Sequence, residues 1–98
     1  MVKTREEIEN AVKTLLNKYK AESAVLFGSY ARNEANDDSD IDLIVVGGDK
    51  FKKVHIFALG EDLREMLNMN ADVFEISEVN VGTPFYNHVM SEGIAINC

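Results

Sequence analysis

The feature that most constrains the fold is the run at residues 41–46, which is apolar except for Asp42 and is followed by Gly47 and Gly48. A short apolar run that ends at glycines is typical of a strand buried on both faces. Such a strand needs neighbours to pair with. Three further runs are expected to supply them, at residues 24–27, 71–76 and 94–96.

Helical patterns alternate with these predicted strands. Thr4 and Glu7 have the spacing of a capping box, and apolar residues follow at helical spacing as far as Tyr19. A second helix is predicted over residues 51–69, where Gly60 interrupts the pattern at a cost of about 1 kcal/mol. A third begins after the cap at Thr83 and ends at Gly93. The alternation favours an α/β or α+β fold.

Length and charge limit the classes of function. A chain of 98 residues with 46% hydrophobic content can bury one modest core, so residues 1–98 are expected to form a single domain. The net charge of -7 opposes binding to nucleic acid backbones. The single cysteine, Cys98, cannot form an internal disulfide, and there is no apolar signal segment or membrane-length run. We expect a soluble, cytoplasmic protein with no nucleic acid or membrane partner.

The first chemically informative pair is Gly28-Ser29, at the end of the predicted strand 24–27. Gly28 permits a sharp turn and the close approach of phosphate oxygens. Ser29 is predicted to cap a short helix that begins near Tyr30, and the N–H groups of such a helix start can bind an anion. Arg32 would then either contact a phosphate or form an exposed ion pair. Taken alone, Gly-Ser after a strand is more often an ordinary turn with a helix cap.

The second pair is Asp40 and Asp42, at the start of the central strand. The strand period of two places both carboxylates on one face, while Ile41, Leu43 and Val45 fill the other. At a separation of about 6.5 Å and an effective dielectric of about 20, their repulsion is roughly 2.5 kcal/mol. A divalent cation such as Mg²⁺ would relieve it. The alternative is a solvated acidic turn without a metal.

A calcium loop is a second alternative, because Asp38, Asp40 and Asp42 reproduce the start of an EF-hand pattern. Leu43, however, occupies the place of the turn glycine, and Asp49 that of the final glutamate. An apolar strand also runs through the middle of the required loop. The pattern therefore disfavours calcium.

Gly28-Ser29, ten intervening residues and then Asp40-x-Asp42 match the G-S-x10-D-x-D motif of the DNA polymerase β-like nucleotidyltransferase superfamily. The chain most resembles its minimal nucleotidyltransferase (MNT) group from end to end. The resemblance implies a mixed central sheet flanked by helices. It also implies that Gly28 and Ser29 bind a nucleotide triphosphate, and that Asp40 and Asp42 hold divalent metals.

The superfamily also uses a third carboxylate on a later strand, and Asp72 is the matching residue. The resemblance implies that Asp72 is a second metal ligand and activates the acceptor hydroxyl. An aspartate that opens a strand can also be a simple turn residue. Glu75 is the rival carboxylate, but three positions along a strand it would point to the opposite face. The implied reaction is attack of a hydroxyl on the α-phosphorus of ATP or another NTP, assisted by two Mg²⁺ ions.

The MNT resemblance implies a protein acceptor, because some members are antitoxins that adenylylate a HEPN-domain toxin. Two alternatives stay open. One is a binding module that silences its partner without catalysis. The other is a small-molecule nucleotidyltransferase, whose acceptor pocket would have to form at the interface of a homo-oligomer because the chain is short. The run of Lys50, Lys52 and Lys53 is predicted to be the solvated start of a helix, not a binding patch.

Overall fold

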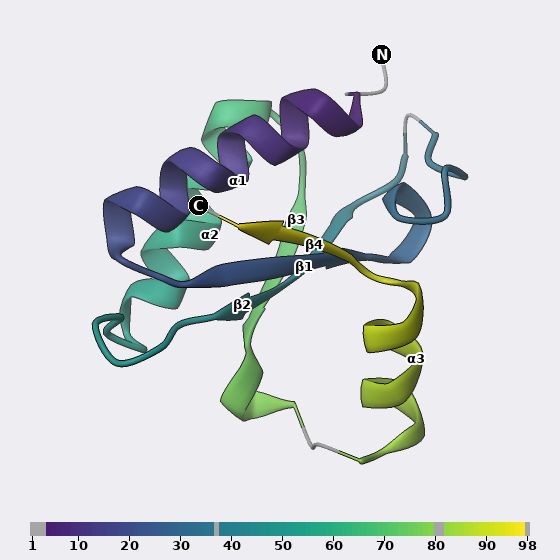
Figure 1. The fold of residues 1–98 in the computed structure, drawn as a ribbon. Helices are drawn as coiled ribbons and strands as arrows, with labels where there is room; N and C mark the ends of the chain where they lie inside the picture. The colour runs from purple at the N-terminus through teal and green to yellow at the C-terminus, as the bar shows by residue number, and fades with distance from the viewer. Residues whose placement is uncertain (1–3, 37, 80–81, 98) are drawn as a thin grey trace.

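The computed structural model describes residues 4–36, 38–79 and 82–97 (Figure 1). Helices and strands alternate along the described chain except at the first two strands, which are joined by a short 3-10 turn and a loop; a second 3-10 turn follows the third strand. In chain order the elements are α1 (Arg5–Tyr19), β1 (Ser23–Phe27), η1 (Gly28–Tyr30), β2 (Ile41–Val46), α2 (His55–Leu67), β3 (Ala71–Glu75), η2 (Ile76–Glu78), α3 (Pro84–Glu92) and β4 (Ile94–Asn97).

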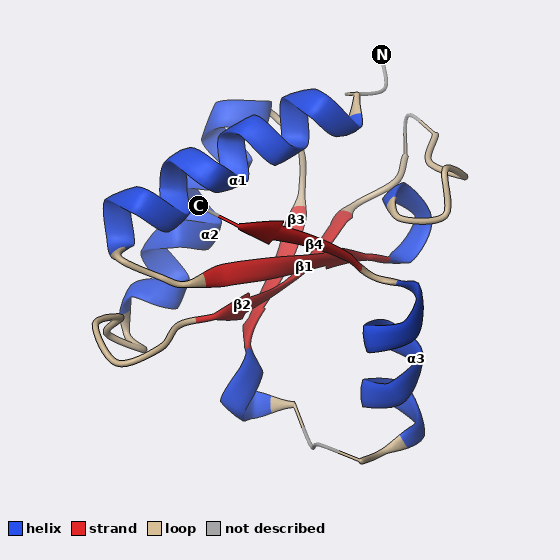
Figure 2. Cartoon of the chain, viewed as in Figure 1, coloured by secondary structure: helices blue, strands red, loops and turns tan. Residues whose placement is uncertain are grey.

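The four strands form one mixed sheet in the order β3-β2-β1-β4 (Figure 2). β1 is antiparallel to both β2 and β4, whereas β2 and β3 run parallel. The predicted mixed sheet with flanking helices is confirmed. The register places Phe27 opposite Asp42, and Asp42 opposite Asp72. The end of β1 and the starts of β2 and β3 therefore meet at one end of the sheet.

The helices cover the sheet from two sides: α1 and α2 lie over one face, and α3 lies on the other side (Figure 1). Ile41, Leu43 and Val45 are completely buried in the core beneath α1 and α2, so the predicted inward face of the central strand is confirmed. Ile44 is also completely buried, although the strand alternation directs it to the opposite face. β2 is thus buried on both faces, as its apolar sequence predicts.

Local hydrogen bonds cap the starts of α1 and α3, as the sequence predicts. The Glu7 N–H donates to Thr4 Oγ1 at 3.1 Å and the Thr4 N–H to Glu7 Oε1 at 3.2 Å, which completes the capping box. The Tyr86 N–H donates to Thr83 Oγ1 at 3.2 Å at the start of α3. Among the helices in the described ranges, none is both long and apolar enough to cross a bilayer.

The prediction of a helix over residues 51–69 is wrong at its start, because α2 begins at His55. Phe51 is apolar for a different reason. It is buried in the loop and packs against Gly47, where a Cβ atom would lie only 2.5 Å from the Phe51 ring. Tight turns follow, with the His55 N–H donating to the Lys52 carbonyl at 2.8 Å. An apolar side chain that anchors a loop gives the same local signal as one on a helix.

A polar contact joins α1 to α2. The Tyr19 hydroxyl donates to Asp62 Oδ2 at 2.5 Å, and Lys18 Nζ lies 2.9 Å from the same oxygen. The hydrogen bond from Tyr19 and then that from Lys18 lower the pKa of Asp62 below its ordinary value of 3.8. The Asp62 carboxylate is thus held in its charged form in the folded protein.

We expect this contact to make stability depend on pH at the acidic end. A carboxyl whose pKa is lowered by folding contributes stability above its unfolded pKa and loses it as pH falls through the folded value. Asp62→Asn should therefore lower the thermal midpoint at pH 7, and the gap to the wild type should close below pH 3.8. Thermal unfolding from pH 7 to pH 2 measures this. Glu61→Gln, one position earlier on α2, is the charge-matched control, and an unchanging gap for Asp62→Asn would contradict the prediction.

Candidate active site

Gly28 and Ser29 lie in η1, the tight turn that directly follows β1. The N–H groups of Ala31 and Arg32 both donate to the Gly28 carbonyl, at 3.1 and 3.2 Å. The N-cap position is Phe27, and no side chain caps the turn. The prediction that Ser29 caps a helix beginning near Tyr30 is therefore wrong. The chain makes one 3-10 turn that starts at Gly28, with Ser29 inside it.

Gly28 packs against the carboxylate of Asp42 on the neighbouring strand. Its backbone has φ +75°, a conformation that favours glycine. A Cβ atom at this position would lie 2.3 Å from Asp42 Oδ2 and 3.3 Å from its Cγ. Two independent constraints, the backbone angle and the neighbouring side chain, therefore require glycine. The turn and the strand carboxylate form one compact unit.

Three carboxylates gather around this unit. Asp40 immediately precedes β2, Asp42 is its second residue, and Asp72 lies opposite Asp42 on β3. Asp42 is half-buried, while Asp40 and Asp72 are exposed. Burial raises the pKa of Asp42 above its ordinary value, the charges of Asp72 and Asp40 raise it further, and Arg32 opposes them. The three acidic groups therefore share one electrostatic field, which disfavours the charged form of Asp42.

The donor chemistry of these carboxylates fits a hard divalent cation. Within residues 4–36, 38–79 and 82–97, no three His, Cys, Asp or Glu side chains are close enough to hold a metal ion by themselves. Mg²⁺ does not need such a cage, because it keeps several waters and is usually bound by one or two carboxylates together with substrate phosphates. The repulsion at Asp42 is what a cation between these oxygens would relieve.

Arg32 forms an exposed ion pair, which is one of the two contacts that the sequence predicted for it. Its Nε lies 3.2 Å from Glu34 Oε2, and both side chains are exposed. The guanidinium is also close enough to Asp42 to lower its pKa. An exposed ion pair of this kind is weak, so the guanidinium can leave Glu34 for a stronger anion.

Arg5 is a residue that the sequence reasoning missed. Its Nη2 lies 3.3 Å from the Ala31 carbonyl and 3.4 Å from the Tyr30 carbonyl, so α1 holds the end of the η1 turn. Its Nε is buried and has no hydrogen-bond partner in the part of the chain that is described. The contact joins residues 25 and 26 positions apart. No local pattern could have indicated it.

A cavity of about 360 Å³ opens beside Asp40, between the loop before β2 and the connection from α2 to β3. Its lining is polar apart from one methionine, and consists of Asp38, Ser39, Asp40, Asn68, Met69 and Asn70. The carboxylate cluster is therefore open on this side, with room for a substrate group.

Glu75 is separated from the cluster, as predicted. It is only 5% exposed and stands opposite Val45, whereas Asp72 stands opposite Asp42. Burial raises the pKa of Glu75, but hydrogen bonds from the Ser77 hydroxyl and N–H, together with the charge of Lys53 and the Gly47 N–H, lower it overall. Glu75 thus has a structural role at the end of β3, and Asp72 is the carboxylate that faces the cluster.

Comparison with known proteins assigns this arrangement to a family. The family model described as "Polymerase beta, Nucleotidyltransferase" matches residues 9–98. The chain belongs to this nucleotidyltransferase family. Members of the family generally use a divalent metal, in agreement with the donor chemistry of the three carboxylates.

Individual relatives extend the assignment to the minimal nucleotidyltransferases. Protein adenylyltransferase MntA of Thermococcus cleftensis is 31% identical over 83 residues, which cover 81% of this chain and 84% of MntA. A Methanocaldococcus jannaschii protein, provisionally named a protein adenylyltransferase, is 30% identical over 97 residues, covering 95% of this chain and 97% of its own. The crystal structure of a toxin-antitoxin with AMP-PNP matches with a TM-score of 0.75 and 26% identity, over 90% of this chain and 71% of that one. The predicted resemblance and nucleotidyltransferase fold are confirmed.

Proposed function

We propose that this nucleotidyltransferase transfers AMP from ATP to a hydroxyl of a protein partner in a Mg²⁺-dependent reaction. The partner we propose is a HEPN-domain toxin, which the chain would neutralise as an antitoxin in the cytoplasm, acting as a single domain over residues 1–98. The observation that carries the proposal is the contact of Gly28 with Asp42, with Asp72 opposite on the next strand. It joins a phosphate-binding type of turn to a metal-binding type of carboxylate cluster.

The turn at the end of β1 is assigned to the donor nucleotide. Gly28 has no side chain to obstruct a phosphate oxygen, and the half-buried Ser29 can donate its hydroxyl to one. Arg32 can exchange its exposed pairing with Glu34 for a charge-assisted bond to the triphosphate. A complex with the nucleotide analogue AMP-PNP is known for a structural relative, which supports a nucleotide as donor.

Asp40, Asp42 and Asp72 are assigned as the residues that would hold the metal ions. When bound, a pair of Mg²⁺ ions would lower the pKa of the acceptor hydroxyl and neutralise charge on the triphosphate and the departing pyrophosphate. The protein residues hold these groups in position. We assign Asp72, which is exposed, as the group that would receive the proton of the incoming hydroxyl.

The acceptor is assigned from what the chain resembles. Relatives carry the name protein adenylyltransferase, and a structural relative is a toxin-antitoxin complex. The cluster opens outward at Asp40 and Asp72, both exposed, so a side chain of a second protein can approach. These points favour a protein hydroxyl over a small-molecule acceptor.

The test is transfer of label from α-labelled ATP to a co-expressed HEPN-domain partner in the presence of Mg²⁺. Wild-type protein should add the mass of one or more AMP groups to the partner, and Asp72→Asn should reduce the rate by about 10²-fold. Glu61→Gln removes one negative charge from the exposed surface of α2 and should leave the rate unchanged.

Each of these measurements can contradict one part of the proposal. Labelling that persists in EDTA would rule out the metal requirement, and full activity of Asp72→Asn would remove that residue from the site. A partner that is bound and neutralised equally by wild type and Asp42→Asn, without label, would favour the non-catalytic binding module.

A further inference from the structure

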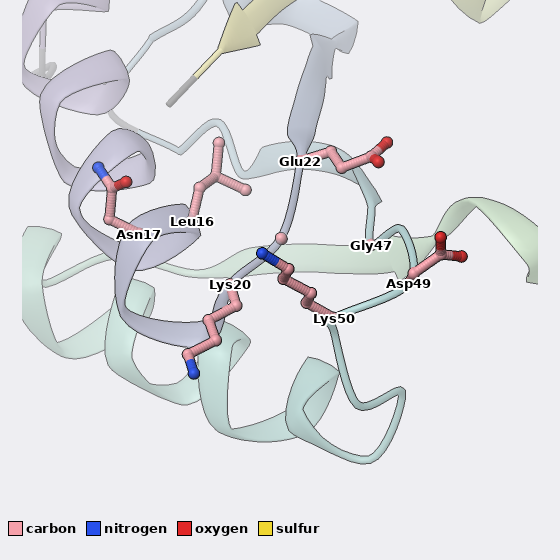
Figure 3. Close-up of a pocket in the computed structure, with 8 residues that line it drawn as sticks. Leu16, Asn17, Lys20, Glu22, Gly47, Asp49 and Lys50 are labelled. Atoms are coloured by element: carbon pink, nitrogen blue, oxygen red, sulfur yellow. The ribbon is translucent and has the colours of Figure 1, made fainter.

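Two adjoining cavities lie at the end of the sheet opposite the carboxylates. One, of about 460 Å³, lies between the end of α1 and the loop after β2 (Figure 3), and is lined by Leu16, Asn17, Lys20, Ala21, Glu22, Gly47, Asp49 and Lys50. The other, of about 340 Å³, is lined by Lys18, Tyr19, Lys20, Lys50, Lys52 and His55. They share Lys20 and Lys50, and we call them together the basic groove.

The basic groove concentrates positive charge in an acidic protein. Four of the ten lysine and arginine residues line it, although the net charge of the chain is -7. Lys18 is paired with Asp62 at 2.9 Å. Within the described ranges, Lys20, Lys50 and Lys52 form no ion pair. The cavity of 340 Å³ has no carboxylate in its lining, so among its lysines only Lys18 has a counter-charge close by.

The two acidic residues of the larger cavity are directed away from the lysines. Figure 3 shows the Lys50 side chain reaching from the loop toward the end of α1, while the carboxylates of Glu22 and Asp49 point to the other side. The Glu22 side chain packs on Gly48, where an added Cβ would lie 2.5 Å from its Cδ. The lining of the groove as a whole contains four lysines and two carboxylates, so positive groups are in excess there.

Lys20 occupies a backbone position that does not favour lysine. It is the C-cap of α1, with φ +62°, where glycine is the common residue. Its positive charge suits a helix C-terminus, but Lys18 in the last turn already provides that charge. Lys20 lines both cavities, and its side chain is exposed and forms no ion pair among the described residues.

Size and position define the ligand class. Both cavities fall in the range of small-molecule sites, roughly 300–1000 Å³. Asp42 and Gly47 are five positions apart along β2 and its end, a span of roughly 16 Å at about 3.3 Å per residue. A nucleotide phosphate held at the carboxylates therefore does not occupy the basic groove.

We propose that the basic groove binds a small multivalent phosphate anion, separate from the nucleotide at the carboxylate cluster. Lys20, Lys50 and Lys52 donate charge-assisted hydrogen bonds to phosphate oxygens, a common role of lysine. The rings of Tyr19 and His55, with centroids 5.5 Å apart, flank the lysines. The anion can be an inorganic polyphosphate or the phosphate tail of a nucleotide, and these two sources differ in whether a base can contact the rings.

The test uses tripolyphosphate as the probe, with EDTA present so that the carboxylate cluster holds no metal. Amide chemical shifts should change saturably at Lys20 and at residues 47–52, with little change at residues 28–32. ATP under the same conditions should produce the same pattern, with added changes at Tyr19 and His55 if a nucleotide is the natural source. An absence of saturable shifts at Lys20 and residues 47–52, or shifts confined to residues 28–32, would overturn the proposal.

Variants distinguish a specific anion site from nonspecific electrostatic attraction of the anion to the protein surface. Lys20→Gly and Lys50→Gln should each weaken tripolyphosphate binding about five- to tenfold, the effect of losing one charge-assisted contact. Lys13→Gln removes the same charge from the exposed surface of α1, outside the groove, and should change binding less than twofold. Lys20→Gly should also raise the thermal midpoint, because glycine suits φ +62°, so loss of binding there cannot reflect unfolding. Equal losses for all three variants would overturn the proposal.

Discussion

Asp42→Asn is expected to reduce nucleotidyl transfer by at least about 10³-fold while raising the stability of the metal-free protein. Under the proposed function, transfer falls because asparagine lacks the charge with which Asp42 would hold a divalent ion. Stability rises because burial and the charges of Asp72 and Asp40 raise the pKa of Asp42, which means that the charged form is disfavoured in the folded state. Label transfer with Mg²⁺ and thermal unfolding in EDTA measure the two effects.

The pH dependence of stability tests independently whether Asp42→Asn raises the stability of the metal-free protein. A carboxyl whose pKa is raised by folding binds protons more readily in the folded state, so stability rises as pH falls from 7 through the raised pKa toward the ordinary value of 3.8. In EDTA the stability of the wild type relative to Asp42→Asn should show this rise, because the other carboxyls, including Asp62 and Glu75, are common to both proteins. A variant that is less stable than wild type at pH 7 would contradict the repulsion assigned to the cluster.

Gly28→Ala is expected to reduce both stability and activity. The left-handed backbone angle costs an L-residue about 1–2 kcal/mol. The new Cβ, 2.3 Å from Asp42 Oδ2, must also displace the carboxylate. We expect a total loss of about 2–4 kcal/mol of unfolding free energy and a decrease in transfer of more than about 10²-fold. Urea unfolding and label transfer measure these losses.

Two comparisons isolate the steric part. Gly82 has φ +86° and no described atom within 4 Å of an added Cβ, so Gly82→Ala carries the cost of the backbone angle alone, about 1–2 kcal/mol. Asp42→Ala removes the oxygen that Gly28→Ala would strike. In that background Gly28→Ala should therefore lose no more stability than Gly82→Ala. An undiminished cost in the double variant would show that Asp42 is not the obstacle.

Sequence patterns correctly predicted the elements that depend on residues close together in the chain. The central strand has the predicted bounds, 41–46, because an apolar run followed by two glycines has few other conformations open to it. Thr4 and Thr83 cap their helices as predicted, because a cap depends on residues three positions apart. The predicted start of α2 was wrong because the apolar side chain of Phe51 packs against the loop at Gly47 and is not part of the helix.

The candidate site likewise combines features that the local sequence indicated with features that it could not indicate. The spacing from Gly28-Ser29 to Asp40 and Asp42 indicated the residues through their resemblance to a family motif. The contact between Gly28 and Asp42 depends on an antiparallel register that places Phe27 opposite Asp42, which no local pattern specifies. The support from Arg5 and the basic groove depend on the way α1 packs against distant turns and loops. These features require the folded chain.

Strand β3 lies at one edge of the sheet and carries Asp72, whereas Asp42 lies on the interior strand beside it. Edge strands are among the first parts of a sheet to open locally, and their amides then exchange hydrogen with solvent. Any cation that bridges Asp42 and Asp72 must oppose this opening, because its binding energy is lost when the strands part. Under the proposed function, occupancy of the site would therefore be thermodynamically linked to the closure of the sheet edge, and the bound cation would also stabilise the pairing of β2 with β3.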